Sequence, residues 1–122
     1  MNNSIFQESD LIIQYTEQQA VEDGFLFDVA QISPEWATKG LFNYITSNLL
    51  DKGYIQSDKS FVPNIIDLLN QANQIVKRKS NNFKAFDHFF SGKIELPSGQ
   101  KQEIFIQQNA TGKFTIMLPE DY

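Results

Sequence analysis

The chain of 122 residues contains no cysteine. Disulfides, thiolate zinc sites, iron–sulfur clusters and a cysteine nucleophile are therefore excluded. Small secreted domains usually depend on disulfides, so we expect a cytoplasmic protein. The sequence also lacks the run of about 20 apolar residues that a membrane helix needs. Residues 1–10 lack the basic start and apolar stretch of a signal peptide, so we expect no membrane partner.

Basic residues are few and unevenly placed. Ten Lys and Arg stand against 15 Asp and Glu, which gives a net charge of −5, and Arg78 is the only arginine. Residues 1–51 carry eight acids and one base, whereas residues 52–119 carry nine bases and five acids. Nucleic acid attracts clustered basic residues, and base readout and phosphate clamping depend on arginine. Direct binding to nucleic acid is therefore not expected.

The length and composition predict one domain over residues 1–122. Six glycines and four prolines are too few for extensive disorder, and eleven phenylalanines can fill a small core. We expect an N-terminal arm over residues 1–10, a mainly helical part over 11–80 and an antiparallel β part over 83–119.

Caps and apolar spacing predict the helices. Thr16 and Gln19 form a capping-box pattern before a short helix that Gly24 ends, and residues 25–29 then resemble a strand. Three further segments have helical spacing or helix starts, namely residues 33–39, 41–50 and 63–79. A loop is expected over residues 54–59. The last turn of the segment over residues 63–79 contains three cations that complement the helix dipole, namely Lys77, Arg78 and Lys79.

The hydrophobic period changes to two after residue 82. Strands are predicted over residues 83–96, 103–107 and 113–118, with turns at 97–100 and 109–112 and a bulge or bend at Gly92. Strands joined by short turns form an antiparallel meander. The predicted fold class is α+β, with about three helical segments before the meander and helices packed on one sheet face.

No catalytic, metal or cofactor motif stands out. His88 is the only histidine, and Asp87 beside it would face the opposite side of a strand, so the pair is not a natural catalytic dyad. Glu22, Asp23 and Asp28 match no calcium-loop spacing. We therefore predict a non-enzymatic protein without a metal or cofactor.

Two sets of residues are candidates for binding. Acidic side chains with one exposed aromatic anchor, Trp36, would suit a basic protein partner. The acidic members of this set are Glu17, Glu22, Asp23, Asp28 and Glu35. The alternative is a small-molecule or nucleotide-binding module, in which an aromatic stacks a base and cations hold phosphate. Its residues would be Lys77, Arg78, Lys84 and Phe86. The exposed edges of a meander would also allow a homodimer.

Two segments carry a resemblance to a known family. The first is the pattern Tyr15-Thr16-x-x-x-Ala20-Val21-x-Asp23-Gly24-x-Leu26-x-Asp28-Val29, and the second is the tail from Thr115 to Asp121. Together they resemble a small family of proteins of unknown function that phages, plasmids and other mobile elements encode. The middle of the chain, residues 37–54 and 59–63, departs from the family pattern.

The resemblance implies a small cytoplasmic protein of a mobile element or its host. With the acidic front half and the lack of catalytic motifs, it leads to one functional hypothesis. The protein would bind and inhibit a host-defence complex that handles nucleic acid, of the CRISPR or restriction type, by meeting its basic surface with carboxylates.

Overall fold

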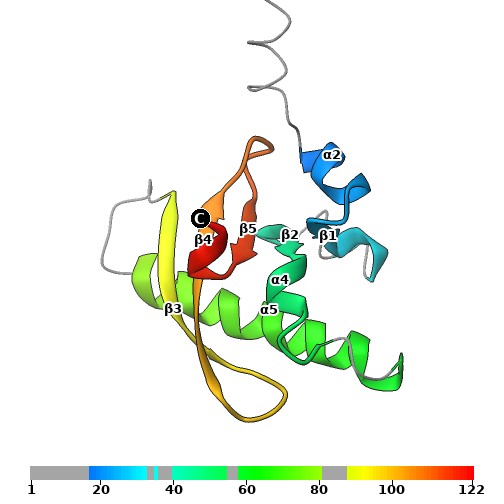
Figure 1. Ribbon diagram of the computed structural model, residues 1–122. Coiled ribbons are helices and arrows are strands. Elements are labelled where there is room, and N and C mark those ends of the chain that lie inside the picture. Colours follow the sequence, from blue (N-terminus) through cyan, green and yellow to red (C-terminus); the bar gives the residue numbers. More distant parts are fainter. Residues whose placement is uncertain (1–16, 33–34, 36–39, 55–57, 81–87) are drawn as a thin grey trace, which may run out of the picture.

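The computed structural model describes residues 17–32, 35, 40–54, 58–80 and 88–122 (Figure 1). The predicted α+β class is confirmed, because helices accompany a single five-stranded sheet. The elements in chain order are α2 (Glu17–Glu22), β1 (Leu26–Asp28), the 3-10 helix η1 (Val29–Gln31), β2 (Phe42–Thr46), α4 (Ser47–Leu50), α5 (Asp58–Ser80), β3 (Phe89–Glu95), β4 (Lys101–Gln108), β5 (Phe114–Met117) and the 3-10 helix η2 (Pro119–Asp121).

The sheet has the strand order β1-β2-β5-β4-β3. Strands β3, β4 and β5 form the predicted antiparallel meander, with tight turns at Gly99 and Gly112, both at positive φ. The sheet as a whole is larger than this meander and is mixed. β1 and β2, from the first half of the chain, extend the sheet, and β2 runs parallel to β5.

The prediction of a helix over residues 41–50 is wrong. Residues 42–46 form strand β2, and only Ser47–Leu50 are helical. The pairing of β2 with β5 shifts register between Phe42 and Tyr44. Such an irregularity places Phe42 and Ile45 on one sheet face although they are three residues apart, and both are fully buried. This spacing imitates a helix in the sequence.

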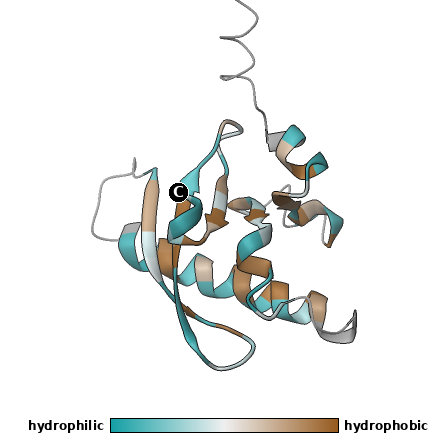
Figure 2. Cartoon of the chain, in the orientation of Figure 1, coloured by the Kyte–Doolittle hydropathy of each residue, from teal (hydrophilic) through white to brown (hydrophobic). Residues whose placement is uncertain are grey.

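Helix α5 confirms the predicted apolar stripe, and hydrophobic and hydrophilic positions alternate along it (Figure 2). It begins at Asp58, five residues before Pro63, so the loop predicted over residues 54–59 is shorter than expected. The residues that it buries against the sheet are Ile65, Leu68, Leu69, Ala72, Ile75 and Val76. One face of the sheet is thereby covered.

Strand β3 lies at the edge of the sheet and close to α5. The predicted bulge at Gly92 is not observed, since Gly92 pairs with Ile104 in a continuous register. A Cβ at Gly92 would lie 2.8 Å from Cδ1 of Ile75, so the glycine allows close approach of the helix. At the outer edge, the Gln71 amide accepts from the Glu95 N–H (2.8 Å) and donates to the Glu95 carbonyl (3.0 Å).

The short helix α2 ends as predicted. Gly24 has φ +83°, and its N–H donates to the Val21 carbonyl. Ala20 is buried, as its place in the first motif predicts. Other predictions lie outside the described residues, namely those for residues 1–16, 33–34, 36–39 and 83–87.

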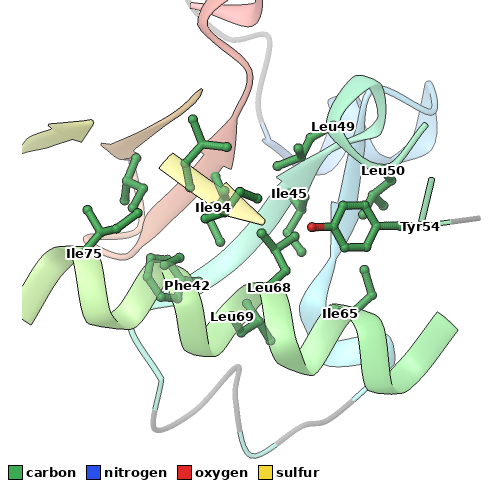
Figure 3. Packing of buried hydrophobic residues seen from close by; sticks show 14 of the residues in the cluster. Phe42, Ile45, Leu49, Leu50, Tyr54, Ile65, Leu68, Leu69, Ile75 and Ile94 are labelled. Atoms are coloured by element: carbon green, nitrogen blue, oxygen red, sulfur yellow. The ribbon is translucent and has the colours of Figure 1, made fainter. Parts of the chain in front are cut away.

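The core contains one buried polar atom without a hydrogen bond among the described residues, the hydroxyl of Tyr54. Tyr54 is 1% exposed, and its hydroxyl points into the apolar cluster (Figure 3). Burial, and secondarily the charge of Asp67, raise the pKa of Tyr54 above its ordinary value of 10.

We expect Tyr54→Phe to stabilise the fold by about 1 kcal/mol at neutral pH, because it removes an unpaired buried hydroxyl. Folding raises the pKa of Tyr54, so above about pH 10 the tyrosine ionises in the unfolded chain before it does in the folded one. The free energy of unfolding of the wild type should therefore decrease as the pH rises above about 10. The gap between variant and wild type in urea denaturation should therefore widen at alkaline pH. A less stable Tyr54→Phe variant would show that the hydroxyl is satisfied.

Candidate functional site

The sheet has one face packed on α5 and one face that α5 leaves open. Alternation along the strands and the pairing registers place Leu26, Thr46, Thr115, Met117 and Gln107 on this open face. Helix η2 and the last residue lie beside it, because Asp121 bonds Thr46 and Tyr122 packs on Phe105. Any site on the open face is therefore built jointly from both ends of the described chain.

The described acidic candidates lie close together in the chain, around the point where it enters the sheet. Glu22 and Asp23 lie at the end of α2, Asp28 ends β1, and Glu35 follows η1 in the chain. Figure 1 shows α2, β1 and η1 together at the β1 edge of the sheet. We call this region, residues 22–28 with Glu35, the acidic corner.

The four carboxylates of the acidic corner differ in accessibility. Glu22, Asp23 and Glu35 are exposed, whereas Asp28 is half-buried and caps η1, with its Oδ1 accepting from the Ala30 N–H at 2.9 Å. Asp28 therefore has a structural role, which an N-cap aspartate commonly has. Glu22, Asp23 and Glu35 are the more accessible residues of the acidic corner.

Phe25 lies at the centre of the acidic corner, and sequence reasoning missed it. Its side chain is 63% exposed, directly after Asp23 and Gly24. Its backbone is fixed on both sides, since its N–H donates to the Ala20 carbonyl (2.8 Å) and its carbonyl accepts from the Ser47 N–H (2.9 Å). The sequence placed Phe25 on an apolar strand, but β1 begins one residue later, at Leu26.

The other predicted members of the protein-binding set are less informative. Glu17 is the first residue of α2. Trp36 lies outside the described residues, and so do Lys84 and Phe86 of the alternative ligand site. The structure therefore brings together Glu22, Asp23 and Asp28 but adds nothing on the predicted aromatic anchor.

The predicted basic residues lie far along the fold from the acidic corner. Lys77, Arg78 and Lys79 are exposed in the last turn of α5. The start of α5 is near β1, where Phe61 contacts Phe27, and its later turns reach β3 at the other edge of the sheet. The molecule therefore has an acidic end at β1 and a basic end beneath β3.

A pocket of about 410 Å³ opens on the open face of the sheet. Its floor includes Thr46 and Thr115, which are both buried. The lining residues are Leu26, Thr46, Gln107, Gln108, Asn109, Ala110, Thr115, Met117 and Asp121. The two segments that carry the family resemblance meet here, because Leu26 belongs to the first and Thr115, Met117 and Asp121 to the tail. Among the described residues, none that lines the pocket is a cation, so this lining does not favour a phosphate.

Hydrogen bonds fix the rim of this pocket. Asp121 Oδ2 accepts from Thr46 Oγ1 and Asp121 Oδ1 from Asn48 Nδ2, both at 2.7 Å. Asn109 Nδ2 donates to Asn43 Oδ1 (2.7 Å) and to Thr115 Oγ1 (3.0 Å). The β4–β5 turn and η2 are thereby tied to β2, and the pocket is preformed.

Beside the pocket, three aromatic rings form a cluster on the open face. Phe89 and Phe105 have ring centroids 4.9 Å apart, and Tyr122 lies 5.1 Å from Phe89 and 5.6 Å from Phe105. All three contacts are edge-to-face, a favourable arrangement. Such packing anchors the end of the described chain against β3 and β4.

The structure also locates the residues considered above as catalytic or metal-binding candidates. His88 is exposed just before β3, and its Nδ1 contacts Oε1 of Gln108; Asp87 lies outside the described residues. Within the described ranges, no group of three or more His, Asp or Glu side chains gathers as a metal site would. No helix in that same part of the chain is long and apolar enough to cross a membrane.

Comparison of the chain with protein-family models, with curated proteins and with solved structures found no match. The resemblance to a mobile-element family therefore stays a prediction, as does the nucleotide-binding alternative.

Proposed function

We propose that this chain is a non-catalytic, cytoplasmic protein-binding protein of a mobile genetic element. It binds through the acidic corner and inhibits a host-defence nuclease complex of the CRISPR or restriction type. The observation that carries the proposal is Phe25, 63% exposed on a fixed backbone beside the exposed carboxylates of Glu22 and Asp23.

Exposed aromatics on rigid backbone supply contact area at little entropic cost, and they are common anchors of protein interfaces. Charged side chains around such an anchor speed association with a partner of opposite charge. A nuclease complex has a basic surface for nucleic acid, so carboxylates around Phe25 compete with phosphates for it. The charge separation between the acidic corner and the basic end of α5 further orients the approach.

The test is inhibition of DNA cleavage by a panel of purified CRISPR effectors and restriction nucleases. We expect the wild-type chain to inhibit a member of the panel and Phe25→Ala to raise the concentration for half-inhibition about tenfold or more. Val62→Ala is the matched control, because Val62 is also exposed, to 42%, but lies on α5. Equal potency of both variants would exclude Phe25 as the anchor.

Charge reversal tests the electrostatic part of the proposal. Glu22→Lys and Glu35→Lys together should weaken inhibition, and the loss should shrink at high salt because exposed charges are then screened. Inhibition that these changes leave untouched would exclude the acidic corner as the contact. A panel without any inhibited member would overturn the proposed target class.

A further inference from the structure

The pocket on the open face has a negative charge that no lining residue in the described part of the chain cancels. Asp121 is the only ionisable residue among the described residues that line it; the remainder are neutral amides, hydroxyls and apolar side chains. The donors to Asp121 are also neutral, namely Thr46 Oγ1, Asn48 Nδ2 and the Leu118 N–H. These bonds hold the carboxylate in place but leave its charge available to a cation.

The remaining walls select among cations. Leu26 and Met117 offer apolar surface, which a strongly hydrated ammonium group tolerates poorly. Gln107 also lines the pocket, and a glutamine side chain can accept hydrogen bonds through its amide oxygen. A guanidinium group is planar and weakly hydrated, and its five N–H donors point in fixed directions toward several acceptors.

We propose that this pocket binds a guanidinium group, and that the group belongs to an arginine side chain of the protein partner. The identity of the donor rests on the proposed function, since a basic nucleic-acid channel is rich in arginine. The pocket also borders the acidic corner, because Leu26, which directly follows Phe25, lines it. A partner bound at the acidic corner is therefore close enough to insert an arginine into the pocket.

The experiment uses the full chain and a minimal probe, N-acetyl-arginine methylamide, followed by ¹H–¹⁵N NMR. We expect saturable shifts at the amides of Thr46, Gln107, residues 115–118 and residues 120–121, with a Kd on the order of 1–10 mM for so small a ligand. The citrulline analogue has the same shape without the charge and should produce no saturable shifts up to about 20 mM.

Variants separate the pocket from general electrostatics. Asp121→Asn should weaken binding at least about fivefold, a loss expected when a charge-assisted hydrogen bond becomes neutral. Glu120→Gln removes the neighbouring carboxylate, which does not line the pocket, and should leave the Kd unchanged. Should Asp121→Asn fail to fold, Gln107→Lys places a cation in the pocket, keeps the Asp121 hydrogen bonds and should abolish binding.

The outcomes are distinct. Absence of binding, equal binding of citrulline, or equal loss in Glu120→Gln would overturn the pocket assignment. Equal binding of n-butylamine would overturn the choice of guanidinium. Because the probe needs no partner, NMR binding without nuclease inhibition would contradict the proposed function alone. Inhibition without NMR binding would contradict only this inference.

Discussion

Replacing Phe42 by alanine is expected to lower the free energy of unfolding by about 3–5 kcal/mol, the usual cost of emptying a buried phenylalanine site. Phe42 is fully buried in the cluster between β2 and α5 (Figure 3). Domains of this size are stable by only about 5–15 kcal/mol, so the loss is a large fraction. Urea denaturation followed by circular dichroism measures it.

Leu41 provides the matched control for Phe42. It is the preceding residue and remains 40% exposed, so Leu41→Ala should cost about 1 kcal/mol or less. In the helix that the sequence predicts, both side chains would belong to one apolar stripe and both changes would be costly. Similar losses in the two variants would therefore contradict strand β2.

Gly92→Ala is expected to destabilise the fold by about 1–3 kcal/mol through overpacking. The new Cβ would lie 2.8 Å from Cδ1, 3.0 Å from Cγ1 and 3.1 Å from Cγ2 of Ile75, which is buried. The sign of the change in the free energy of unfolding is diagnostic. Alanine in place of an uncrowded strand glycine would raise this free energy by about 0.5–1 kcal/mol. The same denaturation experiment measures the change, and a stabilised variant would show that α5 does not approach Gly92.

Ile75→Val tests whether the cost arises at this contact. Valine lacks Cδ1, the atom nearest to the new Cβ. Gly92→Ala should therefore cost less when it is combined with Ile75→Val, by about 0.5 kcal/mol or more, as expected for residues in contact. Ser91→Ala, on the open face of the same strand, should show no such coupling to position 75.

Local signals predicted much of the second half of the fold. The apolar stripe of α5 extends over several turns, and the turns at Gly99 and Gly112 need the positive φ that glycine adopts readily. These signals depend on residues close in the chain, so a single sequence contains them. β3, β4 and β5 were accordingly found in the expected order.

Pairing between distant segments was not predictable in the same way. The register shift in β2 gives Phe42 and Ile45 the three-residue spacing of a helix. Pairing with β1 and β5, which lie elsewhere in the chain, makes that segment a strand. From the sequence alone, a glycine within a strand predicts a bulge or bend at position 92. The actual reason for the glycine is the close approach of Ile75 on α5, which residues near Gly92 in the chain do not reveal.

The candidate site was predictable in its charges but not in its shape. The carboxylates of the acidic corner could be counted directly, although the capping role of Asp28 could not. Phe25 was assigned to an apolar strand, and its exposure depends on where β1 begins. In the sequence, Asp121 stands out only as part of the tail motif. Its position in the pocket depends on hydrogen bonds from Thr46 on β2 and Asn48 on α4, which are distant in the chain.

The parallel pairing of β2 with β5 has a consequence during synthesis. Thr46 and Asp121, which are hydrogen-bonded, stand 75 positions apart in the chain. A ribosome that has just released β2 must therefore translate α5 and the meander before β2 meets β5, whereas its other neighbour, β1, is already synthesised. At a synthesis rate of about 5–20 residues per second, the apolar side of β2 therefore remains without β5 for several seconds. The first half of the nascent chain is thus the part that chaperones or proteases meet unprotected.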